Sequence, residues 1–527
     1  MGLPELSMRT LKHAFDTILA KDPDKVAHIA YGVEWTFAES YRRSLRITRG
    51  LAQLPIARQQ TVATMLDNSI DSAHTFFAIA LGGFIEVPIN TAYKGTFLRH
   101  ILNDSAATVL IVEDRYVDRI NLIATELDTL RTIIVRGSDF QTPAVVTVRS
   151  FADLTANAPA GPIEVEPGEL IAYMYTSGTT GVSKGVLVSH AHAYTYASRE
   201  DFDRPRIYDR ILVALPMFHL AGQWYGLYQG LIHGCTCIIE PGFSVRKFWP
   251  LVRDQQITYT LLLGAMAELM AQQEPTEADA DNPLDTVVMA PLASDVQRFA
   301  DRFAIAPQAV YGMTEIGAVM NGGTDSPLRS GEAGAARRGY TLRVVRPDGS
   351  DTDPGEVGEL LVRPDEPLVV TSGYHNLPEK SAETIHDGWV HTGDAFSRDD
   401  DGHYYFADRI KDALRRRGEN ISSFEVETVI NAHPSVYECA VVAVPSDLTE
   451  DEIKAVIVPR PNTQIDHVAL ISFLVDRLPY FMVPRYIEVV SELPKTPTQK
   501  ISKHILRASA LTGDVWDRDA AGIEVRR

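Results

Sequence analysis

Apolar residues in the first third of the chain follow two alternating patterns. Some segments place apolar side chains three and four positions apart, which predicts amphipathic helices, and others are short β-branched runs typical of buried strands. The helical spacing covers residues 7–21, 36–54 and 71–80, and the strand-like runs are residues 61–66, 108–112 and 132–135. Thr36 stands three residues before Glu39, which predicts a capping box. Strands alternating with helices predict layered α/β subdomains.

The pattern changes at two points further along the chain. After Gly339, residues 340–345 and 358–363 read as strands separated by a turn, which predicts a β-rich subdomain. Beyond the charged run 408–412 the pattern predicts a compact α+β unit, with helices near 424–432 and 466–477 and strands at 440–444 and 454–458. We therefore predict a large N-terminal domain, residues 1–409, and a small C-terminal α+β domain, residues 410–527.

Composition narrows the function classes. The 527 residues carry a formal net charge of −19, which argues against nucleic-acid binding, because a phosphate backbone selects basic surfaces. Cys235, Cys237 and Cys439 are the three cysteines. Cys235 and Cys237 have no further metal ligands nearby, so we expect them in a buried strand, and so few cysteines fit a reducing cytosol.

No segment has the pattern of a signal peptide or a membrane anchor. The longest apolar run, residues 75–90, is interrupted by two glycines, a glutamate and a proline, and is too short to span a bilayer. We therefore expect a water-soluble cytoplasmic protein without a transmembrane segment. The sequence leaves the oligomeric state open, and a homodimer is compatible with it.

The stretch Y-T-S-G-T-T-G-V-S-K-G, residues 175–185, is the most informative part of the chain. Glycines let a backbone approach a ligand closely, hydroxyls donate hydrogen bonds and a lysine adds positive charge. Such a loop between two apolar strands predicts a polyphosphate site, with the candidate ligands Thr176, Ser177, Gly178, Thr179, Thr180, Gly181 and Lys184. It is not the P-loop of nucleoside triphosphatases, because Ser183 precedes Lys184 and Gly185 follows it.

This stretch resembles the phosphate loop of adenylate-forming enzymes, the superfamily of acyl-CoA synthetases, luciferases and peptide-synthetase adenylation domains. The family usually has proline where this chain has Ser183, and we expect the change to loosen the loop slightly. The resemblance implies ATP as a substrate, a polyphosphate-binding role for the loop, and a catalytic role for Thr176.

Further stretches resemble signatures of the same superfamily, in the expected order. The first, V-Y-G-M-T-E at 310–315, implies nucleotide binding by Tyr311, Gly312, Met313 and Thr314, and a catalytic Glu315 that binds Mg²⁺. In G-W-V-H-T-G-D, Asp394 would accept hydrogen bonds from ribose. Arg409 would contact ribose or phosphate, and Lys411 falls at the hinge about which the small domain rotates.

The last signature, L-P-K-T-P-T-Q-K-I, ends near the catalytic lysine of the family, which corresponds to Lys500. A preorganised cation stabilises the charge that develops on the phosphoryl group during adenylation. The family usually has glycine where this chain has Gln499. A weaker match, V-M-A-P, implies that Ala290 and Pro291 line the adenine pocket.

Other segments of the sequence indicate the acceptor of the acyl group and the pocket for the acid. The basic loop R-R-R-G-E-N-I-S, with Arg417, Gly418 and Glu419, resembles the loop that acyl-CoA synthetases present to coenzyme A. Among these enzymes, the sequence is most similar to that of crotonobetaine/carnitine–CoA ligase-like synthetases. His219 in P-M-F-H, Trp224, Gly264 and Gly312 are candidates for the acid pocket, with a catalytic role for His219. A core histidine without a catalytic task stays an alternative for His219. Core packing is as compatible as a pocket wall with Trp224, Tyr225 and Tyr228, which follow at helix-like spacing.

Together these stretches predict an ATP- and Mg²⁺-dependent carboxylate–CoA ligase that acts on a small carboxylic acid through an acyl-AMP. The acid stays open among betaine-type, short-chain, medium-chain, aryl and steroid-derived acids. Two alternatives remain at this point. One is an adenylate-forming ligase with an amine or a carrier protein as acceptor, and the other is a non-catalytic protein with the same fold.

Overall fold

The computed structural model describes residues 3–141, 146–156, 158–159, 161, 163–176, 183–198, 206, 209–271, 273–293, 295–323, 328–329, 331–409, 413–416, 419–446, 450–494, 503–509, 511 and 514–525. The described chain forms two compact units. Unit 1 comprises Met1–Thr91, Ile101–Tyr175 and Gly185–Asp408, and unit 2 comprises Ala92–His100, Thr176–Lys184 and Arg409–Arg527. Among the described residues, no helix combines the length and apolar character needed to cross a bilayer.

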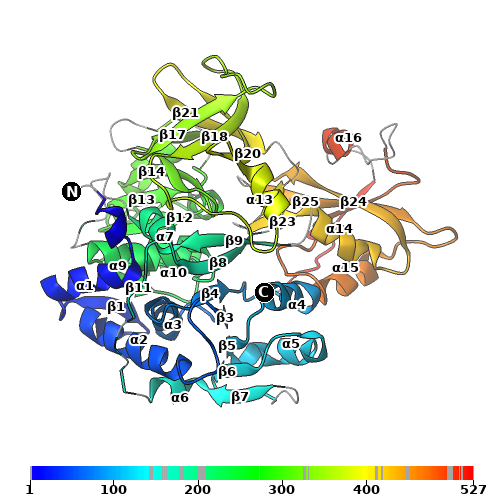
Figure 1. Cartoon of the computed structure of the whole chain (residues 1–527). Coiled ribbons are helices and arrows are strands. Elements are labelled where there is room, and N and C mark those ends of the chain that lie inside the picture. The colour runs from blue at the N-terminus through cyan, green and yellow to red at the C-terminus, as the bar shows by residue number, and fades with distance from the viewer. Residues whose placement is uncertain are drawn as a thin grey trace. The chain divides into compact units, whose positions relative to one another are not determined.

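Unit 1 contains two large sheets (Figure 1). The larger runs in the order β17 (Tyr340–Val345), β18 (Gly358–Pro364), β20 (Trp389–Arg398), β21 (His403–Arg409), β16 (Glu332–Ala336), β15 (Gly317–Gly322), β14 (Ala306–Met313), β13 (Thr286–Met289), β12 (Tyr259–Leu262), β10 (Arg210–Val213), β11 (Thr236–Ile239), β1 (Val26–Ala30) and β2 (Val33–Thr36), with β19 (Ile385–His386) beside β20. Its strands from β14 to β1 are parallel, and the pairs described at its two ends are antiparallel.

The second sheet of unit 1 contains the strands predicted from β-branched runs. Its order is β7 (Thr147–Ser150), β6 (Thr132–Arg136), β5 (Val109–Glu113), β3 (Thr61–Met65), β4 (Ile85–Pro88), β8 (Leu170–Thr176) and β9 (Lys184–Ser189). The pairs from β7 to β8 are parallel. All residues of β3 and β5 are buried, as expected for strands of a parallel sheet covered on both faces.

Helices surround these sheets. Their bounds are α1 (Leu11–Lys21), α2 (Phe37–Leu51), α3 (Ile70–Leu81), α4 (Gly95–Asp104), α5 (Val117–Asn121), α6 (Phe151–Thr155), α7 (His190–Ala197), α8 (Leu220–Gly222), α9 (Gln229–His233), α10 (Val245–Asp254), α11 (Gly264–Ala271), α12 (Val296–Phe303) and α13 (Pro378–Thr384), with short 3-10 turns η1 (Leu6–Met8), η2 (Asp114–Tyr116) and η3 (Ala124–Glu126). The helices α1, α2 and α3 contact one another beside β1, at the blue end of the chain in Figure 1.

The helix ends follow from local capping. The Thr36 hydroxyl accepts from the Glu39 amide at 3.1 Å, and the Glu39 carboxylate accepts from the Thr36 amide at 2.8 Å, which confirms the predicted capping box. The helix expected over residues 7–21 begins only at Leu11, because Thr10 caps it by accepting from the His13 amide.

The aromatic segment after His219 differs from an ordinary α-helix. Residues Gln223–Tyr228 form the π-helix η4 between α8 and α9. Trp224, Tyr225 and Tyr228 in it are at most 1% exposed. π-Helical turns are rare and often occur at functional sites. A spacing of apolar positions does not distinguish them from α-helical turns.

Unit 2 is a mixed α/β body, as its sequence pattern predicted. The strands β24 (Val436–Pro445), β25 (Asp451–Pro459), β26 (Tyr486–Val489) and β27 (Val515–Asp517) form one sheet. A hairpin of β22 (Ala413–Arg416) and β23 (Glu419–Ser422) precedes it, and the helices are α14 (Ser423–Asn431), α15 (His467–Val475) and α16 (Lys503–Ala508). The fully buried Lys454 ammonium lies 2.7 Å from the Glu488 carboxylate, which compensates a charge that would be costly to bury alone.

These features confirm the predicted fold class, a large layered α/β part with a β-rich region and a smaller α+β part. The longest segment of unit 2 begins at Arg409, and unit 2 also contains Ala92–His100 and Thr176–Lys184; the division into domains 1–409 and 410–527 stays a prediction. Rotation of residues 410–527 about Lys411 stays a prediction, and Lys411 lies outside the described residues.

Candidate active site

Several predicted site residues lie at one edge of the larger sheet. The strands β10, β12, β13 and β14 are parallel neighbours, so their carboxyl ends share that edge. His219 follows β10, Gly264 follows β12, Ala290 and Pro291 follow β13, and residues 311–315 end β14 and continue past it. Ligands of open α/β sheets bind outside the carboxyl ends of the strands. This edge of unit 1 is therefore the candidate active site.

Glu315 is held at this edge by a tyrosine that is distant in sequence. Its carboxylate is buried and accepts a hydrogen bond of 2.8 Å from the Tyr374 hydroxyl. Tyr374 is itself anchored, because it forms a bridge with Val186 in β9 and the next amide, of His375, donates to the Gly185 carbonyl. A fixed carboxylate is the donor type that Mg²⁺ prefers. Glu315 therefore fits the predicted metal ligand in chemistry.

Tyr311 and Asp394 are joined directly. The Tyr311 hydroxyl donates to the Asp394 carboxylate at 2.8 Å, and its ring packs edge-on against Phe396 with centroids 4.7 Å apart. Asp394 is 3% exposed. The sequence assigned one residue to adenine and the other to ribose, and the structure brings the two to one place by pairing distant segments of unit 1.

The glycine after Tyr311 is required by close packing of strands. A side chain at Gly312 would place its Cβ 2.3 Å from the Gly317 carbonyl oxygen in β15. Gly317 has a φ of +77°, and the space beside it is bordered by Tyr196 and His192 of α7. Gly312 and Gly317 therefore allow β14, β15 and α7 to pack closely at this point. Thr314, the next candidate, is buried.

His219 and Trp224 differ in their surroundings. The His219 ring accepts from the Ala221 amide at 3.4 Å and so caps α8. Trp224 is fully buried, with its ring edge-on to Tyr196 at 5.8 Å, and its Nε1 has no hydrogen-bond partner among the described residues. Gly264 is buried at the first position of α11.

The buried histidines of α7 are electrically neutral. Burial lowers the pKa of both His190 and His192 to about 3, because a charged imidazolium loses its hydration inside the protein. His192 lies beside Gly317 and therefore near the Tyr311–Glu315 segment. It adds a polar but uncharged wall there.

Comparison with known proteins agrees with this geometry. Residues 15–375 match the model of the AMP-binding enzyme family, and residues 425–500 match that of the AMP-binding enzyme C-terminal domain. The chain belongs to the AMP-binding enzyme family. This confirms the prediction that the chain is a member of the adenylate-forming superfamily, whose members are ATP-binding ligases.

Relatives of this AMP-binding enzyme differ in acid and in acceptor. It is 30% identical to a fatty acid–[acyl-carrier-protein] ligase of Streptomyces coeruleorubidus, with 92% of this chain and 93% of the relative covered. It is 27% identical to a crotonobetaine/carnitine–CoA ligase of Salmonella typhi, with 95% and 99% covered. An o-succinylbenzoate CoA synthetase from Bacillus subtilis shares the fold, with a TM-score of 0.82, 23% identity and 96% and 99% covered.

The segment predicted to bind phosphate lies between two strands, as expected. Thr176 ends β8 and Lys184 begins β9, and the candidates Ser177, Gly178, Thr179, Thr180 and Gly181 lie outside the described residues. Within unit 2, the Ser183 hydroxyl donates to Glu425 at 3.1 Å and the Ser183 carbonyl lies 2.8 Å from the His100 ring. Burial raises the pKa of Glu425 to about 7. Ser183 is therefore a bonded residue, although its sequence suggested only a looser loop.

The remaining candidates belong to the C-terminal segment. Arg409 is the last residue of β21 and Glu419 the first of β23. Arg417, Gly418 and Lys500 lie outside the described residues.

The sequence patterns did not predict three residues that lie beside the site. Tyr374, Tyr196 and His192 contact or border the Tyr311–Glu315 region, yet they belong to no stretch with a recognisable signature. Only the pairing of β9 with the segment around Tyr374 and the packing of α7 on β15 bring them there.

Proposed function

We propose that this AMP-binding enzyme is an ATP-dependent carboxylate–CoA ligase. The observation that carries the proposal is the Tyr311–Asp394 hydrogen bond at the sheet edge that also holds Glu315. A partly buried tyrosine and a buried carboxylate suit an adenosine, and a second fixed carboxylate suits a metal-bound phosphate. His219 and Gly264 follow strands whose carboxyl ends lie at the same edge of the sheet, and we propose that they border the space for the acid.

In the first half-reaction, a carboxylate oxygen of the acid attacks the α-phosphorus of ATP and pyrophosphate leaves. Asp394 accepts from the ribose hydroxyls, and Tyr311 holds Asp394 while it packs beside the base. Thr314 donates to the α-phosphate. Glu315 and phosphate oxygens would hold Mg²⁺, which neutralises phosphate charge when bound. Lys500 stabilises the negative charge that develops on the phosphoryl oxygens.

In the second half-reaction, the thiolate of coenzyme A attacks the carbonyl carbon of the acyl-AMP and AMP leaves. We propose that the C-terminal segment turns about Lys411 between the two steps. The turn withdraws Lys500 and brings Arg417, Gly418 and Glu419 to the coenzyme A. A location in the cytoplasm is supported by the three cysteines, which are free and buried and suit a reducing compartment.

A second candidate acceptor is a carrier protein. It is favoured by one observation, the relative that is named as an acyl-carrier-protein ligase and matches over most of both chains. The chemistry of the first half-reaction is the same in both cases, since only the attacking thiol differs.

The test is a pyrophosphate-release assay with panels of short-chain, medium-chain, aryl, betaine-type and steroid-derived acids, with and without coenzyme A. We expect ATP- and acid-dependent pyrophosphate release, and an acyl-CoA detected by mass spectrometry only when coenzyme A is present. Glu315→Gln should reduce release by about 10²-fold or more, and Glu34→Gln, at an exposed position, should not. If AMP forms only when a carrier protein or an amine is added, that molecule is the acceptor and the proposed role of coenzyme A is wrong.

A further inference from the structure

The hairpin of β22 and β23 in unit 2 contains a buried arginine. The two strands form a sheet of their own, and a two-stranded hairpin by itself is at best marginally stable in water. Leu414 in β22 pairs with Ile421 in β23, and both side chains are buried. Side chains two positions apart share one face of a strand, so Arg416 lies on the face of Leu414, and it is 2% exposed. A charged side chain thus occupies an inward position of this hairpin.

The Arg416 guanidinium joins the hairpin to two other parts of unit 2. Its Nη1 donates to the carbonyl oxygens of Phe481 and Val483, each at 3.1 Å. Its Nε lies 2.8 Å from a carboxylate oxygen of Glu452, near the start of β25. The carboxylate compensates the charge of the buried guanidinium, and the planar guanidinium presents its donors in fixed directions. This side chain therefore fixes both the distance and the direction of the hairpin.

The segment that accepts these hydrogen bonds belongs to the interior of unit 2. Phe481, Met482 and Val483 precede β26 and are at most 1% exposed. Buried carbonyl groups outside a strand need donors from other parts of the chain. Two residues further on, the Arg485 amide donates to the Ile453 carbonyl of β25 at 3.1 Å. Arg416 therefore connects the hairpin to the framework of the four-stranded sheet.

A second buried arginine donates to the same segment from another element. Arg518 follows β27 and is 3% exposed. Its Nη1 donates to the carbonyl oxygens of Val483 and Pro484 at 3.2 and 3.3 Å, and its Nε and Nη2 donate to the Asp519 carboxylate. Both arginines satisfy buried carbonyl groups around Val483, but of the two it is Arg416 that belongs to the hairpin. Arg518 is therefore a matched control for the structural part of this role.

Arg416 stands directly before the residues assigned to coenzyme A in the proposed function. It pairs with Glu419 across the hairpin, and Arg417 and Gly418 follow it in the sequence. Arg416 belongs to the same basic run, yet its guanidinium contacts carbonyl groups and a carboxylate of the protein. At 2% exposure it is not available to a phosphate group of coenzyme A. Any effect of Arg416 on coenzyme A is therefore exerted through the hairpin.

We propose that Arg416 is a positioning residue for the thioester-forming half-reaction. It sets the place and the direction of the hairpin end that meets coenzyme A, without contacting coenzyme A itself. A misplacement of about 1 Å can cost about 10²-fold in rate, so loss of this anchor should impair the second half-reaction. The first half-reaction, as proposed above, does not use the hairpin and should continue. This inference rests on the proposed function, because it assigns a further residue to the same reaction.

The test measures the two half-reactions separately in the full chain, with the acid that gives the fastest pyrophosphate release in the panel above. The second half-reaction starts from the supplied acyl-AMP of that acid, and acyl-CoA is followed by mass as the coenzyme A concentration varies. Arg416→Met should lower kcat/KM for coenzyme A by about 10- to 100-fold and leave pyrophosphate release close to that of the wild type. Arg416→Lys keeps a charge for Glu452 but loses the planar fork. It should show a smaller loss of the same kind, and it serves if Arg416→Met does not fold.

Arg518→Met is the control for stability. It removes the donors to Val483 and Pro484, so its midpoint of urea denaturation should fall, as that of Arg416→Met should, while its kcat/KM for coenzyme A stays at the wild-type value. If the variants at Arg416 and Arg518 lose thioester formation to the same extent, Arg416 only stabilises unit 2 and the inference is wrong. The inference is also wrong if neither variant at Arg416 changes the dependence on coenzyme A.

The wild type separates this inference from the proposed function. If it releases pyrophosphate but forms no acyl-CoA from supplied acyl-AMP, coenzyme A is not the acceptor, and the inference fails together with that part of the proposed function. Absence of pyrophosphate release with every acid, by a wild-type protein that unfolds cooperatively, would overturn the proposed function as a whole. Acyl-CoA formation by the wild type that is insensitive to Arg416→Met and Arg416→Lys would overturn the inference alone.

Discussion

The strand edge around Glu315 and the π-helix η4 both contain buried polar groups, but the hydrogen bonding of these groups differs between the two regions. At the strand edge, Glu315 accepts from Tyr374 and Asp394 accepts from Tyr311. In the π-helix, Trp224 Nε1 and the Tyr228 hydroxyl have no partner among the described residues, and their rings pack edge-on against other aromatic side chains. A buried polar group without a partner is costly, so it persists only where the packing of the ring outweighs that cost.

This difference assigns different tasks to the two regions. Hydrogen bonds fix the direction of a carboxylate, which suits a ligand that is the same in every turnover. Close packing of buried rings stabilises the folded state. Changes at the strand edge should therefore act on catalysis, whereas changes in the π-helix should act on stability.

The largest effect is expected at the lysine that the family resemblance assigns to adenylation. Lys500→Ala should reduce acyl-AMP formation by about 10³-fold, since a preorganised charge is lost from the developing phosphoryl transition state. Thioester formation from supplied acyl-AMP and coenzyme A should continue at close to the wild-type rate. The two half-reactions are measured separately, by pyrophosphate release and by thioester mass. An equal loss of rate in both half-reactions would contradict the proposed turn of the C-terminal segment between them.

A large effect on stability, with little on the first half-reaction, is expected for Trp224→Ala. Removal of a fully buried indole typically costs about 3–5 kcal/mol in free energy of unfolding, which urea denaturation of both proteins measures. Pyrophosphate release per folded molecule should change much less than in Glu315→Gln. If the variant is as stable as the wild type but inactive, Trp224 acts in catalysis, and the π-helix does not differ from the strand edge in the way we expect.

Tyr374→Phe tests the strand edge with a smaller change. The variant keeps the ring and loses the hydroxyl that donates to Glu315. A hydrogen bond to a charged group contributes enough that kcat/KM for pyrophosphate release should fall about tenfold. The Mg²⁺ concentration that gives half-maximal rate should rise, a response that a purely structural tyrosine would not produce. An unchanged Mg²⁺ dependence would show that Tyr374 does not orient this carboxylate.

The smallest effect concerns Glu86, which joins β4 to the π-helix. Its carboxylate is buried and accepts from Gln223 at 2.9 Å and from Thr64 at 3.0 Å. Burial raises the pKa of Glu86 from 4.5 to about 7, so the folded state binds the proton more tightly than the unfolded state. The stability from this group is complete below pH 4.5 and is lost as the pH rises through about 7.

Glu86→Gln carries no titrating group at this position. Relative to this variant, the wild type should lose at most about 1.4 kcal/mol of unfolding free energy for each pH unit in that range. Urea denaturation of both proteins at several pH values measures the difference. A difference that stays constant from acid to neutral pH would contradict the assigned protonation. The buried histidines titrate in both proteins and cancel in this comparison.

Most of the secondary structure could be predicted because its causes are local. The capping box of Thr36 and Glu39, the apolar runs of β3 and β5, and the strand–loop–strand around the phosphate loop each depend on residues close together in sequence. The π-helix could not be predicted, since its aromatic positions fit an α-helix equally well and the packing of α7 and β10 against it is tertiary.

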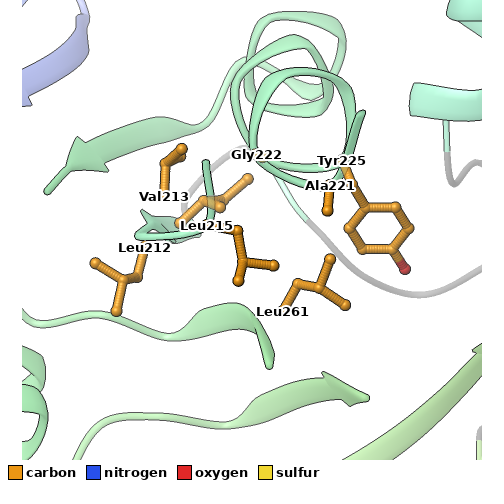
Figure 2. A pocket seen from close by; sticks show the side chains of 9 residues that line it. Leu212, Val213, Leu215, Ala221, Gly222, Tyr225 and Leu261 are labelled. Carbon is orange, nitrogen blue, oxygen red and sulfur yellow. The ribbon is translucent and has the colours of Figure 1, made fainter. Parts of the chain in front are cut away.

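The candidate site divides in the same way. The stretches that contain Lys184, Glu315 and Asp394, in this order along the chain, resemble signatures of adenylate-forming enzymes, and this resemblance was sufficient to predict the family because each signature is contiguous in sequence. The contacts of Tyr374 with Glu315 and of Tyr311 with Asp394, and the position of Tyr225 near Leu261 (Figure 2), were decided only by the tertiary structure. Each of these joins segments far apart in sequence, and no local pattern encodes which of many tyrosines will reach a given carboxylate once the sheets are paired.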